Sequence, residues 1–101
     1  MIPIDPDRLD WREAYRLLTG SVLPRPIAWV STISSSGVPN LAPFSFFTGI
    51  CARPLTVCFA PMVRGTDGGR KDTLRNIEET GQFVVNVVTE ENAGLMNATS
   101  A

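Results

Sequence analysis

The chain has 101 residues, the size of one small domain. It is 44% hydrophobic and 19% charged, a composition typical of globular proteins and unlike that of disordered or fibrous chains. Nine basic and ten acidic residues give a formal net charge of -1, which argues against a surface built for nucleic acid or an anionic membrane. Because the chain has no histidine, Ser-His-Asp and Cys-His nucleophile activation and histidine-containing zinc sites are excluded within it.

The cysteine content and the lack of long apolar runs bear on the compartment. Cys51 and Cys58 are too few for a disulfide scaffold or a four-cysteine metal site. Both lie in apolar, strand-like sequence, so we expect two buried free thiols. No positively charged start leads into an apolar run, and no apolar stretch approaches the ~20 residues of a membrane span. We therefore expect a cytoplasmic protein with neither a membrane nor nucleic acid as its partner.

A short helix is expected after Asp10, which can cap its first turn. Gly20 can end this helix, and its apolar side chains share one face, namely Trp11, Tyr15 and Leu18. Two prolines then forbid helix around Arg25. Arg25 is either a turn residue, which is the favoured reading, or a fixed cation near the edge of a ligand.

Three strands are expected in the middle of the chain. Residues 27–33 are rich in β-branched and aromatic side chains, and residues 34–37 form a hairpin turn in which Gly37 can adopt a positive φ. The second strand spans 38–50 and is an edge strand or is bulged at Pro43, because proline cannot donate to a sheet ladder. Residues 55–60 form the third strand.

The last third of the chain alternates loop, helix, strand and helix. A loop over 61–70 leads into a helix that begins at 71–73, has Leu74 and Ile77 on one face and closes near Gly81. Residues 82–88 form a fourth strand, and Thr89 can cap a final helix. The pattern predicts a mainly β fold with short helices. Four strands leave open edges, so either a partner supplies further strands or the sequence is a piece of a longer chain.

Residues 68–77 form a glycine-rich loop that runs into a helix start. Free backbone N–H groups and the helix dipole favour an anion there, and Arg70 and Lys71 add positive charge. The Thr73 hydroxyl adds a donor, so a phosphate monoester would fit. Taken alone, however, the stretch favours the alternative of a surface loop in which Asp72 caps the helix.

Residues 40–48 place three aromatic rings and two hydroxyl groups on one irregular strand. A planar heteroaromatic ligand needs this mixture, because apolar faces take its rings and backbone groups released around Pro43 can bond its polar edge. The alternative, which the alternation favours, is core filling with Phe44 and Phe46 on one face and Phe47 on the other.

Other conspicuous residues are assigned to structure. Trp29 is expected in the core, and Glu78 with Glu79 on a solvated helix flank. We find no pair of carboxylates placed for acid-base chemistry.

The sequence resembles the flavin reductase-like family over roughly residues 17–101. The run PRPIAWVST at 24–32, followed by GVPNLAPFSFF at 37–47, is similar to the family's pattern. The blocks RKDTLRNI at 70–77 and FVVNVV at 83–88 match two further family blocks in the same order. Several blocks in the family's order are specific for the family, though not for one substrate.

The resemblance implies an FMN-binding split β-barrel, usually a homodimer, with residues 1–101 as the N-terminal part of a truncated domain. It implies that FMN is bound non-covalently and leaves open whether FAD can substitute. By matching position, the flavin would be lined by Asn40, Ala42, Pro43, Phe44, Ser45 and Phe46, with Thr32 on the neighbouring strand. The phosphate would be held by Arg70, Lys71 and Thr73.

The activity implied is hydride transfer from NAD(P)H to the flavin, in some family members with a monooxygenase as partner. The flavin carries this chemistry and the protein supplies binding, orientation and electrostatics, so no catalytic side chain is required. Hydrogen bonds from the strand through Ser45 would stabilise the reduced ring at its N1–C2=O edge. Three alternatives stay open, namely an electron carrier without its own nicotinamide site, a non-catalytic fold fragment and a pyridoxine-phosphate oxidase-like protein.

Overall fold

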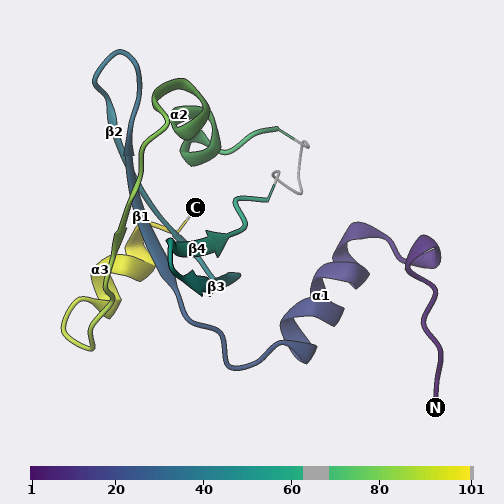
Figure 1. Ribbon diagram of the computed structural model, residues 1–101. Helices are drawn as coiled ribbons and strands as arrows, with labels where there is room; N and C mark the ends of the chain where they lie inside the picture. The colour runs from purple at the N-terminus through teal and green to yellow at the C-terminus, as the bar shows by residue number, and fades with distance from the viewer. Residues whose placement is uncertain (63–68, 101) are drawn as a thin grey trace.

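The computed structural model describes residues 1–62 and 69–100, and most of the predicted loop at 61–70 lies outside them. Figure 1 shows the elements in chain order. They are η1 (Pro6–Arg8), α1 (Trp11–Ser21), β1 (Ala28–Ile33), β2 (Pro39–Phe44), β3 (Phe47–Ala52), β4 (Leu55–Phe59), α2 (Asp72–Thr80), β5 (Val84–Asn86) and α3 (Ala93–Ala98). The prediction of a mainly β fold with short helices is confirmed. Within the described residues, no helix has the length and apolar composition needed to cross a bilayer.

The described strands form two antiparallel sheets, one of three strands in the order β2–β1–β5 and one of two strands, β3–β4. β1 and β2 form a long hairpin whose register runs from Ala28 opposite Phe44 to Ile33 opposite Pro39. Its turn contains Gly37 at a φ of 88°, the conformation that the sequence predicted.

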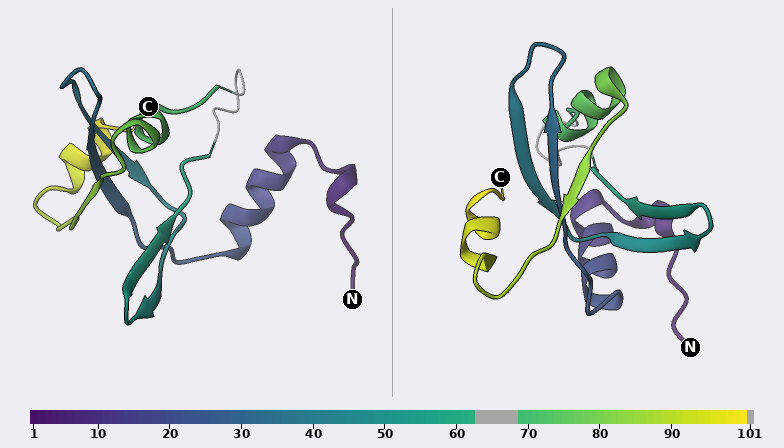
Figure 2. Two further views of the ribbon diagram at one scale, coloured as in Figure 1. Left: turned by 45° about the horizontal axis from the view of Figure 1, so that its top comes forward. Right: turned by 60° about the vertical axis from the view of Figure 1, so that its left-hand side comes forward.

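The two faces of the three-stranded sheet carry different helices, as the views in Figures 1 and 2 show. Because side chains alternate along a strand, Thr32 of β1 points to one face and meets α2, whereas Trp29 points to the other. Trp29 Nε1 donates to Thr99 Oγ1 at 3.0 Å, just after α3. Trp29 is buried, as predicted.

The prediction of a single strand over 38–50 is wrong, because the strand is interrupted at Ser45 and Phe46 and the chain passes from one sheet to the other. Pro43 does lie in an edge strand, since β2 is the outer strand of its sheet. The residues around the break, which include Phe44, Phe46 and Phe47, are all typical of a strand, so composition alone gave no sign of it. The break turns β3 away from β2 and leaves a junction between the two sheets.

The core is small and lies between the two sheets. Its buried members are Ala28, Val30 and Phe44, against which four further side chains pack, namely Ala42, Phe47, Phe59 and Val85. The prediction of buried thiols is wrong, because Cys51 and Cys58 are both exposed and free. The β3–β4 sheet contributes only one end to this core, where Phe47 and Phe59 pair, so the rest of the sheet remains open to solvent.

Local sequence signals set most helix ends. Asp10 caps α1 by accepting from Glu13 N at 2.8 Å, while Glu13 accepts from Asp10 N at 3.3 Å, a reciprocal capping box. α1 continues through Gly20 and ends at Ser21, one residue later than predicted. Gly81 closes α2 at a φ of 70°.

The final elements are shorter than predicted. The fourth predicted strand, 82–88, is reduced to Val84–Asn86. The last helix has Asn92 at its N-cap position, so the expectation that Thr89 caps it is wrong. Thr89 instead closes the preceding turn, where its Oγ1 accepts from Asn92 N at 3.4 Å.

Candidate functional site

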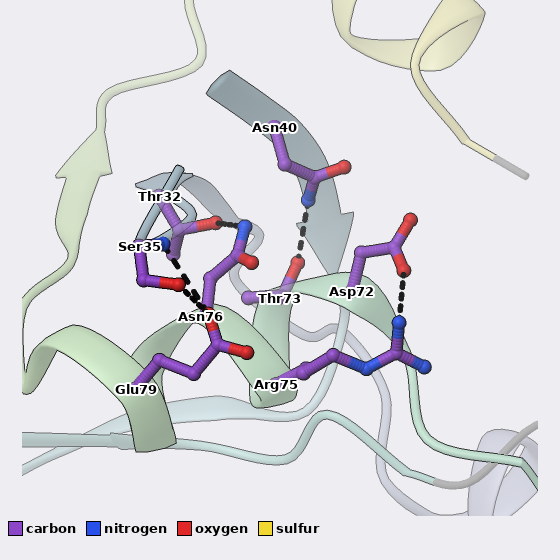
Figure 3. Close-up of polar contacts among 8 residues, drawn as sticks. All are labelled: Thr32, Ser35, Asn40, Asp72, Thr73, Arg75, Asn76 and Glu79. Carbon is purple, nitrogen blue, oxygen red and sulfur yellow. Dashed lines mark hydrogen bonds and ion pairs between the residues drawn. The ribbon is translucent and has the colours of Figure 1, made fainter. Parts of the chain in front are cut away.

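Two hydrogen-bonded pairs attach α2 to the β1–β2 hairpin, and Figure 3 shows them side by side. Asn40 Nδ2 donates to Thr73 Oγ1 at 2.9 Å, and Asn76 Nδ2 donates to Thr32 Oγ1 at 3.0 Å. Thr32 lies opposite Asn40 in the sheet register, while Thr73 and Asn76 are one turn apart on α2. The four side chains therefore form one polar layer between the helix and the strands.

This polar layer is largely buried and retains donor capacity. Thr73 is 1% exposed, Asn76 6% and Thr32 7%. In each pair the amide is the donor and the hydroxyl oxygen the acceptor, so each hydroxyl keeps its own hydrogen to donate. No residue that the structure describes accepts either hydrogen. Because a buried donor without an acceptor costs about 1–3 kcal/mol, the layer favours a ligand that offers oxygen acceptors.

The first turn of α2 lies beside this layer and has no side-chain cap. Its N-cap residue is Lys71, which is extended at φ -71° and ψ 151° and makes no capping hydrogen bond. The alternative in which Asp72 caps the helix is therefore wrong. Asp72 lies within the first turn, with its Oδ1 3.8 Å from Arg75 Nη1. Among the residues that the structure describes, none thus supplies the first N–H groups of α2 with the side-chain acceptor that usually satisfies them.

The two cations predicted beside this turn, Lys71 and Arg70, have different surroundings. Lys71 Nζ lies 5.4 Å from the centroid of the Phe44 ring, next to the core. Arg70 Nη1 pairs with Glu78 on the next turns of α2, and both side chains are about half exposed. Arg70 is thus already paired, whereas Lys71 lies between the start of α2 and β2.

The acidic pair predicted on a solvated flank is exposed but engaged. Glu78 binds Arg70, and Glu79 accepts from Ser35 N at 3.2 Å and Ser35 Oγ at 3.0 Å. The Ser35 contacts join α2 to the tip of the β1–β2 hairpin, as Figure 3 shows. Glu79 therefore helps to fix the position of the helix.

Two hollows meet at Asn40, one on each side of the hairpin end. The polar one, of about 360 Å³, lies between the β1–β2 turn and α2 and includes Ser35, Asp72 and Asn76. The larger one, of about 710 Å³, lies on the sheet and includes Trp29, Thr32 and Asn86. Pro39 and Asn40 line both hollows. Asn40, which is half-buried, therefore borders both hollows, whereas Thr73 lines neither of them.

The β2–β3 junction supplies free backbone groups. The β1–β2 ladder ends at Phe44 and the β3–β4 ladder begins at Phe47, so Ser45 is paired in neither. The carbonyl of Phe46 accepts from Ala60 N at 3.0 Å. The sequence predicted released backbone groups around Pro43, but Pro43 lies in the ladder opposite Trp29. The release occurs at Ser45 instead.

The phenylalanines of this segment have different surroundings. The expectation that Phe44 and Phe46 share one face is wrong, because the strand breaks between them. Phe44 is buried against Phe59, with ring centroids 5.3 Å apart, which confirms core filling at that position. Phe46 is partly exposed and packs against Tyr15 in a T-shaped arrangement, with ring centroids 6.4 Å apart. Phe46 is thus the aromatic side chain of the junction that lies outside the core.

The structure brings together part of the predicted set. Asn40 and Thr73 are hydrogen-bonded to each other, and Thr32 is bonded to Asn76 on the same helix. Lys71 lies beside Phe44. Ala42 packs partly against the core, and Pro43 lies on the face opposite to that of Asn40.

Sequence reasoning missed Asn76. The sequence feature that could have indicated it is the spacing of three residues between Thr73 and Asn76, which places both polar side chains on one helix face. That face, rather than the one with Leu74 and Ile77, contains the most buried residues of α2.

Comparisons with known proteins identify the relatives of this chain. Residues 19–101 match the model of a family described as flavin reductase like domain. An uncharacterized protein of Halalkalibacterium halodurans is 50% identical over 96% of this chain and 46% of its own length. An uncharacterized protein of Bacillus subtilis is 44% identical over 94% of this chain and 45% of its own. The chain therefore spans about half the length of the curated relatives it matches.

Solved structures agree with these relatives. Nitrilotriacetate monooxygenase component B from Bacillus cereus matches with a TM-score of 0.90 and 39% identity over 100% of this chain and 50% of its own. The 2-nitrobenzoate 2-nitroreductase NbaA of Pseudomonas fluorescens matches with a TM-score of 0.78 and 40% identity over 97% of this chain and 46% of its own. A protein with a split barrel domain from Shewanella frigidimarina, 21% identical over 94% of this chain and 45% of its own, has a TM-score of 0.72. The fold is thus that of about half of a split barrel.

Proposed function

Because the chain belongs to the flavin reductase-like family, we propose that residues 1–101 are the N-terminal, FMN-binding part of an NAD(P)H-dependent flavin reductase. The observation that carries the proposal is the buried polar layer at the start of α2. There Thr73 and Thr32 are held by Asn40 and Asn76 with their hydroxyl hydrogens free to donate. This layer suits the phosphate end of a flavin nucleotide.

At the phosphate end, three kinds of donor converge. Thr73 offers its hydroxyl, the uncapped first turn of α2 offers backbone N–H groups and Lys71 offers a charge. Asp72 would oppose an anion, but Arg75 lies 3.8 Å from its carboxylate. We assign the main cationic role to Lys71 and a smaller one to Arg70, because Arg70 is already paired with Glu78.

The ring end lies at the β2–β3 junction. At about 3.3 Å per residue, the strand from Asn40 to Ser45 is roughly 16 Å long, which gives an extended ligand room to lie along β2. Ser45 offers backbone groups outside both ladders, and Phe46 offers a partly exposed aromatic ring outside the core. Ala42, Pro43 and Phe44 would shape this path mainly through the backbone, since their side chains pack elsewhere or lie in the core.

FMN, when bound, supplies the redox chemistry, in which a hydride from NAD(P)H carries two electrons to the flavin and leaves oxidised nicotinamide. The protein binds and orients the cofactor, and hydrogen bonds from the Ser45 backbone stabilise negative charge on the ring. No side chain of this chain needs to gain or lose a proton in that scheme.

The wider setting is also part of the proposal. The match to a monooxygenase component supports a role as the reductase that supplies reduced flavin to a partner oxygenase. We propose a homodimer, in which a second copy and the rest of the domain cover the exposed apolar residues of β3 and β4, Ile50, Leu55 and Val57. Free thiols at Cys51 and Cys58 suit a reducing, cytoplasmic compartment.

One experiment tests the activity directly. The purified protein is saturated with FMN, its visible spectrum is recorded, and NADH or NADPH is added without oxygen. Bleaching of the flavin band is the expected result. A flavin band that persists would favour an electron carrier without a nicotinamide site. A protein that stays colourless and associates as its concentration rises would favour a non-catalytic fragment, and FAD in parallel tests the choice of flavin.

A further inference from the structure

Arg25 lies where the end of α1, the linker before β1 and the β2–β3 junction meet. Its Nη1 atom donates to the carbonyl oxygens of Thr19 at 2.8 Å and Val22 at 2.6 Å. Both carbonyls belong to the C-terminal end of α1, where the helix dipole is negative. The guanidinium also lies over the Phe46 ring, with its Cζ atom 5.2 Å from the centroid. Two carbonyls and one aromatic ring therefore hold Arg25 in place.

The charge of Arg25 is fixed but not neutralised. Across residues 1–62 and 69–100, no carboxylate comes within ion-pair distance of it. Its Nε atom is buried and has no hydrogen-bond partner in that part of the chain. Carbonyl groups and aromatic rings orient a guanidinium without removing its charge. The arrangement is therefore that of a preorganised cation whose charge no described carboxylate balances.

The contact with Phe46 places this cation at the ring end of the proposed flavin site, next to Ser45. Building on the proposed function, we propose that Arg25 stabilises the reduced, negatively charged flavin more than the oxidised, neutral one. Hydride addition at the flavin N5 leaves negative charge on the N1–C2=O side of the ring until a proton is taken up. A fixed guanidinium nearby favours that state, because charge near the flavin ring tunes its electronics.

The test compares the affinity of the protein for oxidised FMN with its affinity for FMN reduced by dithionite without oxygen. In Arg25→Gln, we expect the loss of affinity for reduced FMN to exceed the loss for oxidised FMN by roughly tenfold, the scale of one charged interaction. By linkage, this lowers the two-electron potential of bound FMN by about 30 mV. Arg25→Lys keeps the charge and should keep most of the preference.

Arg12 provides the matched control. It lies over the Trp11 ring, with Cζ 4.8 Å from the centroid, and it is exposed on the first turn of α1. Arg12→Gln therefore removes the same charge and a similar ring contact away from Phe46, and should leave the ratio of the two affinities unchanged. Equal losses for both redox states in Arg25→Gln, or the same change in Arg12→Gln, would overturn the inference.

A measurement on the unmodified protein keeps the inference testable if Arg25→Gln does not fold, as judged by circular dichroism. Bound reduced FMN should remain anionic to a lower pH than free reduced FMN, as followed by its absorption spectrum. Protonation at a higher pH than in free FMN would contradict the role of Arg25. An unmodified protein that binds no FMN would instead remove the proposed function, and this inference with it.

Discussion

The side chain of Asn40 on β2 donates to the hydroxyl of Thr73 in the first turn of α2, at 2.9 Å, and so fixes both the helix and the hydroxyl hydrogen. Because the Thr73 oxygen is the acceptor, this bond does not use the hydroxyl hydrogen, which we propose is donated to a ligand. A sheet residue thus orients a donor on a helix. This relationship connects the fold with the proposed phosphate site.

Removal of the Thr73 hydroxyl tests this relationship. Thr73→Val keeps the shape of the side chain but removes the donor and leaves the Asn40 amide without its acceptor. We expect FMN binding to weaken by about 1.5–3 kcal/mol, the range for a hydrogen bond to a charged group. Thr73→Ser restores the hydroxyl and should recover most of the affinity, as measured by fluorescence titration. Equal affinities in the Val and Ser variants would show that the hydroxyl does not contact the ligand.

Variants of Lys71 and Arg70 test which of the two cations binds the phosphate, because Arg70 is already paired within the protein. Lys71→Ala should weaken FMN by about 1.5–3 kcal/mol and riboflavin much less, because riboflavin has no phosphate. Arg70→Ala should have a smaller effect, since Arg70 already binds Glu78. Calorimetric titration of both variants with both ligands gives the comparison. If Lys71→Ala weakens the two ligands equally, the phosphate does not lie at this helix start.

Asn76 is expected to matter for stability as well as for the site. Asn76→Ala leaves the buried hydroxyl of Thr32 without its donor, so we expect a loss of about 1–3 kcal/mol in the free energy of unfolding. Asn97→Ala on the exposed surface of α3 is the control and should change stability by less than about 0.5 kcal/mol. Urea denaturation measures both. Similar stabilities for the two variants would mean that the Asn76–Thr32 bond contributes nothing.

Alanine substitutions at two glycines are expected to change the stability of the protein in opposite directions. Gly81 has a φ of 70°, so Gly81→Ala should destabilise the protein by about 1–2 kcal/mol even though its Cβ would meet open space. Gly20 lies inside α1, where a Cβ also meets nothing within 4 Å, so Gly20→Ala should stabilise by about 0.5–1 kcal/mol. Thermal unfolding distinguishes them. Shifts of the same sign would contradict the backbone conformations described above.

The sequence predicted those features that depend on one residue and its neighbours. Asp10 caps α1, Gly37 turns the hairpin and Gly81 ends α2 because each has a local chemical property that the backbone needs there. The family resemblance was carried by whole motifs in order, and the family match confirms it.

Features that depend on packing between distant segments were not predictable in this way. The break at Ser45 falls within a run of strand-forming residues, and its position depends on how the two sheets meet. The exposure of Cys51 follows from what covers β3, which its own sequence does not specify. The role of Asn76 appears only once α2 is placed over Thr32.

The most direct test of the proposed site is the affinity of the unmodified protein for FMN compared with riboflavin, measured by titration under the same conditions. If the start of α2 holds the phosphate, FMN should bind at least about tenfold more tightly, because charged hydrogen bonds contribute about 1.5–3 kcal/mol. Equal affinities for the two flavins would contradict the account.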